Sequence, residues 1–528
     1  MSLREYAGKA APNAPGLLLI LSAALGGLRS PLMWIVYAVF FLTWFLESGR
    51  PLSAAGREYG LLFFCWLAAA AFFSADPAFS LSVLAKYAVF SALFFSAAHG
   101  EEEGWVSAIT GLGLVASAFF VFQKASGQPV TGFIGANPNY SAAFAAAAFP
   151  VALTRAADAA GRRRAAFVLL CVILAVGLYC SGSRGALAAA FLSAAAGLAA
   201  YGRRRTLAML FLAAAGAAAL LPAASLEGLL KFHDPRAFAR PLIWGTALRA
   251  AAASPLLGWG PGLFDRVFEL FKFPYFDGVS FYGHNTLHAH GELFNLAAEA
   301  GFPAALLFLA AAISGIFRGG REQLPLKLCT LAVFLQGGLD IVFYSGAVSL
   351  LFWGSLGILS AKEGGERGAG RGPALLAAAC MAGLVSSWWL SLPSKISVGS
   401  YPEAALARAR LESMVRPTDP FPRAMEGDIL YKSGDLRGAG TAYGQALALE
   451  PFFASVRLDL ARVYADSGRR KAACLEAALA AKAAAMKADG GYQAILTGLD
   501  RAELEKFNKD ICGKKKAGGA TAPGRKMR

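Results

Sequence analysis

The sequence predicts an all-α protein: a polytopic membrane helix bundle of about 12–13 spans, a large outward-facing loop, and a small helical domain after the last span. Of its 528 residues, 56% are hydrophobic and only 16% are charged, whereas soluble domains have roughly 25% charged residues. Apolar runs of about 15–20 residues recur from Leu17 to Leu392, near the length that a helix needs to cross a bilayer. From residue 401 onward the pattern becomes that of a soluble protein.

Thirteen apolar runs are predicted to span the membrane between residues 14 and 392. They are 14–28, 32–46, 60–74, 79–98, 105–122, 139–154, 165–180, 185–201, 206–223, 293–317, 325–344, 346–361 and 374–392. Helices are the economical way to satisfy the backbone in hydrocarbon.

The strongest basic clusters fall on alternate loops, which the positive-inside rule makes cytoplasmic. These are Arg162 to Arg164, Arg203 to Arg205, Arg318 with Arg321 and Lys327, and Lys362 with Arg367 and Arg371. The N-terminus, 1–13, is then cytoplasmic, and the segments 123–138, 181–184, 224–292 and everything after Leu392 face outward. Glu101, Glu102 and Glu103 fall on the cytoplasmic side, but acidic residues weigh little in this rule.

The net charge of +16 does not indicate nucleic-acid binding, because the basic residues form short clusters between apolar runs. The seven cysteines have no paired metal or redox spacing, and we interpret them as small packing residues. They are Cys65, Cys171, Cys180, Cys329, Cys380, Cys474 and Cys512. The cysteines therefore indicate neither a metal site nor a redox site, and we expect no cofactor.

The segment 401–490 has a 34-residue period, which is the length of a tetratricopeptide repeat. The equivalent positions are Ala405, Ala439 and Ala473, Pro417 and Pro451, and Gly434 and Gly468. Such a short array binds a protein partner or serves as a stabilising appendage, and the sequence leaves both open. The basic tail 513–528 is predicted to be disordered.

Two arginines stand out on the predicted outer face. Arg184 ends the Ser181-Gly-Ser-Arg turn between two spans, where its planar fork suits phosphate oxygens. Snorkelling to the interface is the alternative role. Arg240 lies in the long loop, and helical spacing places Trp244 on the same face.

A string of polar residues ends the long loop and is a candidate for proton transfer. His284, His288 and His290 are followed by Glu292 and an apolar helix that contains Glu299. A histidine at the mouth of a span is well placed to exchange protons near neutral pH. The alternatives are a zinc site that includes Asp277 or Glu292, and an interfacial role without chemistry.

A further polar turn, Asn137-Pro-Asn139-Tyr, precedes the sixth span. Its amides could bind sugar hydroxyls or cap the next helix, and the general preference of asparagine favours capping.

Taken in order, these motifs resemble the O-antigen ligase and polymerase superfamily of bacterial envelope glycosyltransferases. The resemblance covers roughly residues 60–360. Its pieces are Asn137-Pro-Asn139-Tyr, Ser181-Gly-Ser-Arg184-Gly, Arg240-x-x-x-Trp244, Pro255-Leu-Leu-Gly258-x-Gly260-x-Gly262, and His290-x-Glu292-x6-Glu299-x-Gly301.

The resemblance implies a metal-independent transfer of a glycan from undecaprenyl diphosphate to an acceptor hydroxyl at the periplasmic face of the bacterial inner membrane. It implies that Arg184 and Arg240 bind the diphosphate and that His290 is the base. Asn137, Asn139, Trp244, Glu292 and Glu299 are expected to support them. The family usually has asparagine after this histidine, whereas Gly291 stands here. Displacement in one step would invert the anomeric carbon.

The acceptor expected of an O-antigen ligase is a lipid A core sugar, while a glycan or an exported protein would make the chain a polymerase or a protein O-oligosaccharyltransferase. Membrane lipids surround the bundle, and the repeat domain could bind a protein partner. A transporter or scaffold is the alternative from another class, because Lys86 and Asp340 lie within or near spans.

Overall fold

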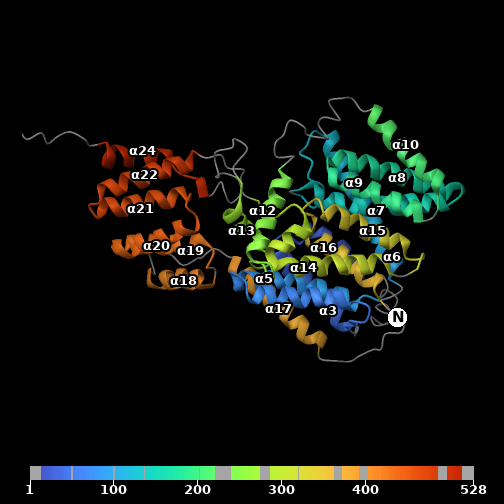
Figure 1. Cartoon of the computed structure of the whole chain (residues 1–528), viewed down its shortest axis with the longest axis horizontal. Helices are drawn as coiled ribbons and strands as arrows, with labels where there is room; N and C mark the ends of the chain where they lie inside the picture. The colour runs from blue at the N-terminus through green and yellow to red at the C-terminus, as the bar shows by residue number, and fades with distance from the viewer. Residues whose placement is uncertain are drawn as a thin grey trace, which may run out of the picture. The chain divides into compact units, whose positions relative to one another are not determined.

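The computed structural model describes most of the chain as helices joined by short turns (Figure 1). It describes residues 14–48, 52–98, 101–135, 137–200, 202–220, 239–273, 286–318, 320–361, 372–391, 402–415, 417–485 and 496–513. These residues contain no strand, so the predicted all-α class is confirmed. The chain forms two compact units, 1–271 with 287–392 and 272–286 with 393–528.

The first unit is a helix bundle in which each of the thirteen predicted spans corresponds to one described helix. Their bounds are α2 Ala14–Ala24, α3 Pro31–Glu47, α4 Glu58–Phe72, α5 Pro77–Ser96, α6 Glu102–Ala125, α7 Pro138–Asp158, α8 Gly161–Ser181, α9 Arg184–Ala200, α10 Arg204–Leu220, α14 Glu292–Phe317, α15 Leu324–Gly337, α16 Gly346–Leu359 and α17 Gly372–Ser391. Among the described residues, α5, α6, α8 and α14 are both long enough and apolar enough to cross a membrane. Most of the others are shorter apolar helices of 10–17 residues.

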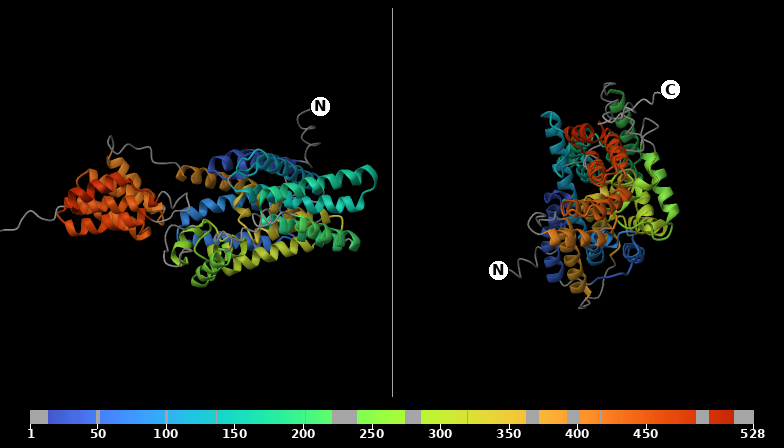
Figure 2. Two further views of the ribbon diagram at one scale, coloured as in Figure 1. Left: turned by 90° about the horizontal axis from the view of Figure 1, so that it is seen from above. Right: turned by 90° about the vertical axis from the view of Figure 1, so that its left-hand side faces the viewer.

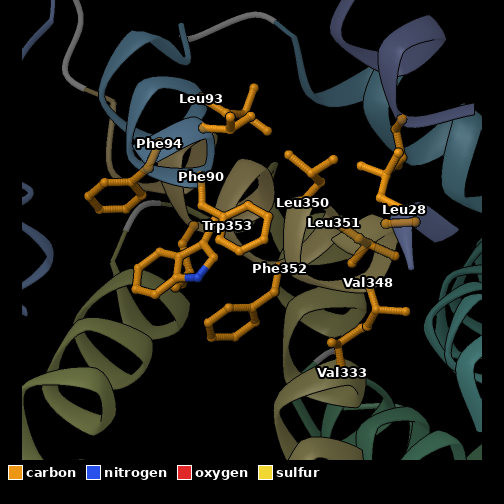
Figure 3. Packing of buried hydrophobic residues seen from close by; sticks show 14 of the residues in the cluster. Leu28, Phe90, Leu93, Phe94, Val333, Val348, Leu350, Leu351, Phe352 and Trp353 are labelled. Atoms are coloured by element: carbon orange, nitrogen blue, oxygen red, sulfur yellow. The ribbon is translucent and has the colours of Figure 1, made fainter. Parts of the chain in front are cut away.

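Aromatic side chains form much of the centre of the bundle. Trp353 of α16 stacks on Phe63 with ring centroids 5.3 Å apart, and it also contacts Phe94 and Phe352 (Figure 3). The opposite surface of some helices is equally apolar: Leu169 of α8 is 60% exposed. Exposed side chains of this kind suit a lipid environment rather than water.

Polar side chains join several helix ends at one end of the bundle. At one face, buried Arg57 donates from its guanidinium to the carbonyls of Phe95, Ala97 and Gly357 at 2.6–2.7 Å. At the same face Gln323 donates to Glu102 at 3.0 Å. Glu102, one of the three acidic residues at the start of α6, is therefore held by the segment that precedes α15.

The second unit contains antiparallel helices stacked side by side (Figure 2). Their bounds are α18 Pro402–Val415, α19 Pro420–Lys432, α20 Leu436–Leu449, α21 Ala454–Asp466 and α22 Arg470–Ala484. The starts of α19 and α21, and those of α20 and α22, are 34 residues apart. A Cβ at Gly427 would lie 2.5 Å from the Tyr443 ring, so this small residue allows α19 and α20 to pack closely.

The helical structure continues beyond residue 490, where we expected the repeat segment to end. Helix α24, Arg501–Phe507, and η4, Asn508–Cys512, follow the array, and Leu504 packs against Leu458 and Ala477. Cys512 forms a disulfide with Cys474 of α22. The interpretation of all seven cysteines as packing residues is therefore wrong for this pair. Periodicity could not reveal it, because only one of the two cysteines lies in the repeated pattern.

Replacing Cys474 with serine is expected to destabilise the C-terminal unit by roughly 2–4 kcal/mol, the usual range for a disulfide that closes a loop of this order. The pair closes a separation of 38 residues. Urea-dependent proteolysis of the purified full-length chain would measure this loss. Cys380→Ser is the matched control, since Cys380 is a buried free thiol in the bundle. Equal protease resistance in wild type and Cys474→Ser would contradict the prediction.

Candidate active site

The turn between α8 and α9 is built by the Ser-Gly-Ser sequence that precedes Arg184. Gly182 adopts a left-handed conformation with φ of 65°, and Ser183 Oγ accepts from the amide of Ala186 at 3.3 Å. Arg184 is consequently the first residue of α9. A Cβ at Gly185 would lie 3.3 Å from Asp340 Oδ2, so the start of α9 lies beside this carboxylate.

Helix α12, Arg240–Ala253, carries the second predicted arginine toward the same carboxylate. Arg240 Nη2 lies 3.4 Å from Asp340 Oδ2. One turn later, Trp244 Nε1 donates to the His290 carbonyl at 3.3 Å, and its ring stacks on Phe294. The expectation that Arg240 and Trp244 share a helix face is confirmed.

Asp340 brings the predicted residues together, and sequence reasoning did not place it in the site. Its side chain is only 2% exposed and faces Arg240 through Oδ2, while Oδ1 lies 4.0 Å from His290 Nδ1. The available signal was a carboxylate inside an apolar run, which we assigned to the transporter alternative. Charged residues inside a membrane bundle, such as Lys86 and Asp340, can instead belong to one polar site, because intramembrane charges usually face a partner or a cavity.

The backbone at His290 is held in a conformation that is uncommon outside glycine. Its φ is 52°, and non-glycine residues with positive φ concentrate at functional sites. Steric crowding explains why glycine occupies the next position, 291. A Cβ there would lie 3.0 Å from the Gly338 carbonyl and 3.1 Å from Trp244 Nε1. Asparagine, which is usual in the family at this position, would therefore crowd the contact that supports His290.

The Gly/Pro-rich loop after α12 packs directly on α14. The amides of Trp259 and Gly260 donate to the carbonyls of Ala298 and Glu299 at 3.1 and 2.8 Å. The Glu299 carboxylate accepts from the amides of Gly262 and Phe264, at 2.9 and 3.2 Å. Glu299 thus anchors the segment that leads into α13, Phe264–Phe271.

Glycine is required where this loop crosses the helix. Gly258 has a φ of 65°, and a Cβ there would lie 2.3 Å from the Glu299 backbone. Gly301 has a φ of 83°, and a Cβ would lie 2.0 Å from the Leu256 carbonyl. The glycine motifs of the loop and of α14 therefore form one backbone-to-backbone contact.

The two predicted asparagines differ in role. Asn137 Oδ1 accepts from the amide of Asn139 at 3.0 Å, so Asn137 caps α7 as expected. The carbonyl of Asn139 accepts from Gln336 Nε2 at 3.1 Å, one helical turn before Asp340. These residues position the elements around the site.

A pocket of about 210 Å³ opens at this end of the bundle. The carboxylates of Asp265, Glu292, Glu299 and Asp340 line it together with His290 and the basic side chains Arg29 and Lys86. The rest of the lining includes six aromatic residues, Trp34, Phe79, Tyr87, Phe90, Phe343 and Tyr344. The two charges that suggested a transport path, Lys86 and Asp340, thus face the same pocket.

A second cavity, of about 290 Å³, adjoins this pocket and shares Glu292 and Phe343 with it. Apart from Glu292, its lining is apolar and comes from α9, α14, α15 and the turn that follows. It includes Ala188, Ala189, Leu192, Leu293, Phe308, Phe334, Leu335 and Leu339. A polar pocket and an apolar cavity thus meet at Glu292.

His288 is half-buried and packs against Tyr344, with ring centroids 4.2 Å apart. Burial, and to a smaller extent nearby His290, lower the pKa of His288 to about 3. His288 therefore stays neutral near physiological pH and is unsuited to a proton-transfer role there. Within the described segments, no three His, Cys, Asp or Glu side chains are grouped to hold a metal. Asp277 and His284, named for the zinc alternative, lie outside the described residues.

The depressed pKa of His288 predicts a pH-dependent loss of stability. Below the usual histidine pKa of about 6.5, the unfolded chain binds a proton that the folded chain does not, so the stability falls as the pH drops from about 6.5 toward about 3. His288→Gln removes this difference. We expect the fall in melting temperature between pH 7.5 and pH 5 to be smaller in His288→Gln than in wild type. An unchanged fall would contradict the neutral state of His288.

The fold and the site define a multi-pass helical membrane protein in which two arginines, a histidine and a buried aspartate come together at one face of the bundle. Residues 169–309 match the family model described as O-antigen ligase, the superfamily that the motifs resemble. This segment contains Arg184, Arg240 and His290. None of the curated proteins matches the chain significantly.

Proposed function

We propose that this protein transfers a glycan from undecaprenyl diphosphate to an acceptor hydroxyl at the periplasmic face of the inner membrane. The observation that carries the proposal is the position of Asp340. Its carboxylate contacts Arg240, faces His290 and lies beside the start of α9, where Arg184 stands. His290 and Asp340 line the pocket, and in this proposal Arg240 and Arg184 bind the diphosphate beside Asp340.

The arrangement suits a single displacement. The acceptor oxygen attacks the anomeric carbon, and the bond from that carbon to the diphosphate oxygen breaks. The leaving diphosphate keeps the electron pair, and the Arg184 and Arg240 guanidinium groups stabilise its charge. His290 takes the proton of the attacking hydroxyl. The products are an inverted glycoside and undecaprenyl diphosphate.

The apolar cavity supports a lipid-linked donor. Arg184, Ala188 and Leu192 are spaced by four residues, so they share one face of α9. Ala188 and Leu192 line the apolar cavity. A diphosphate held at the start of α9 would thus have its isoprenoid chain directed along this face, into hydrocarbon-like surroundings.

The disulfide supports a periplasmic position for the C-terminal unit. Disulfides form and persist in oxidising compartments such as the bacterial periplasm. The Cys474–Cys512 pair therefore agrees with an odd number of spans and a cytoplasmic N-terminus. In this orientation the repeats, of tetratricopeptide type, would meet exported proteins or assembly partners.

The test is a reconstituted transfer assay in which a carrier-linked glycan is offered with a lipid A core, a glycan or a protein acceptor. Arg184→Ala and Arg240→Ala are each expected to lower kcat/KM by roughly 10²–10³-fold, the usual effect of removing a donor that stabilises developing charge. Arg249→Gln is the matched control on α12, since this arginine contacts Thr246 and the Phe271 carbonyl. Normal transfer in both alanine variants would refute the proposal, and the acceptor that reacts separates ligase from polymerase and protein transferase.

A further inference from the structure

We propose that Arg29 and Lys86 form an anion-binding subsite that selects an acceptor saccharide carrying a phosphate or carboxylate group. This inference rests on the proposed glycan transfer and names the class of its acceptor. The subsite is distinct from the pair Arg184 and Arg240, because its residues come from other elements: α5 and the turn before α3.

Helix α5 presents one continuous face to the pocket. Its lining residues, Phe79, Val83, Lys86, Tyr87 and Phe90, follow helical spacing. Lys86 is the one charged residue in this stripe and is half-buried. Arg29 follows the 3-10 turn Gly26–Leu28 and lines the same pocket.

Arg29 and Lys86 have no ion-pair partner in the described part of the chain, although carboxylates line the same pocket. Neither Arg29 nor Lys86 has an ion pair or a side-chain hydrogen bond to a described residue. Three of the four pocket carboxylates are already engaged: Asp340 by Arg240, Asp265 by Arg266, and Glu299 by the amides of Gly262 and Phe264. The fourth is Glu292. A cation within a membrane bundle is costly without a counter-charge. An anionic group on a ligand would supply it.

The surroundings of this subsite suit a sugar. Trp34, Tyr87 and Tyr344 line the pocket beside the two cations, and such side chains combine an apolar face with a polar edge. Sugar rings can pack on these faces while their hydroxyls remain hydrogen-bonded. Lysine acts as a point charge and can bind either phosphate or carboxylate oxygen. We therefore assign the anion to the saccharide rather than to the leaving diphosphate.

The experiment compares two acceptors with one donor: a phosphorylated core oligosaccharide and the same oligosaccharide after dephosphorylation. Lys86→Gln and Arg29→Gln are each expected to raise the KM for the phosphorylated acceptor roughly 10- to 100-fold, the effect of losing a hydrogen bond to a charged group. The kcat should change little, and the KM for the neutral acceptor should not change. Lys124→Gln, at an exposed lysine on α6, is the matched control.

Additional experiments distinguish the acceptor assignment from its alternatives. A donor series with neutral and acidic sugars tests whether the anion belongs to the donor, and a KM change that follows donor charge would overturn the acceptor assignment. An equal rise in KM for both acceptors would also overturn the acceptor assignment. The same rise in KM in Glu292→Gln would overturn it as well, because it would indicate that Glu292 is the ion-pair partner of these cations. Lys86→Arg should retain discrimination if the glutamine variant does not fold. A wild type inactive with every acceptor refutes the proposed function, whereas equal KM values for both acceptors refute only the subsite.

Discussion

Replacing His290 with alanine is expected to lower kcat by roughly 10²–10⁴-fold, the usual contribution of a general base. The affinity for the carrier-linked donor should change little, because Arg184 and Arg240 remain in place. His290 lines the pocket, and its Nδ1 faces the Asp340 carboxylate at 4.0 Å. The other ring nitrogen is then the atom available to take a proton from the acceptor.

The measurement is single-turnover transfer with purified enzyme in nanodiscs, together with donor binding to the same preparation. Added imidazole should restore part of the activity of His290→Ala, since a small base can enter the space left by the ring. It should restore nothing in Arg240→Ala, which keeps its histidine. A His290→Ala enzyme with near-normal kcat would exclude this residue as the base.

The helices could be predicted from the sequence because their signal is local. Each span is a continuous apolar run, and all thirteen runs correspond to helices in the described residues. The cap by Asn137 and the shared helix face of Arg240 and Trp244 could also be predicted, since each depends on spacing within one element. A feature that depends on residues within a single helix can thus be predicted from the local sequence pattern.

The missed features depend on residues far apart in the chain. Asp340 joins the site only when α12 and the segment before α14 meet the end of α15, and no spacing encodes this meeting. The disulfide joins Cys474 to a segment beyond the repeats. Gly291 departs from the asparagine usual in the family, and the close approach of Trp244 and Gly338 explains why glycine stands there. Such contacts follow from packing, which a single sequence does not display.

Asp340→Asn is expected to lower kcat/KM at least about 100-fold while leaving the bundle folded. Asparagine keeps the size of the side chain but removes the charge opposite Arg240. The side chain is only 2% exposed, and removing one partner of such a buried pair costs about 3–5 kcal/mol. Part of this cost would appear as a lower melting temperature, so thermal stability must be measured beside activity.

Separate measurements distinguish positioning from simple loss of stability. If Asp340 orients both Arg240 and His290, the asparagine variant should bind the donor more weakly and also turn over more slowly once saturated. Arg240→Ala should weaken donor binding and also lower kcat, whereas His290→Ala should lower kcat with little change in donor binding. In the double variant Asp340→Asn with His290→Ala, the losses should be less than additive, because both changes remove the same oriented base. Fully additive losses would mean that Asp340 acts independently of His290, and its carboxylate would then serve Arg240 alone.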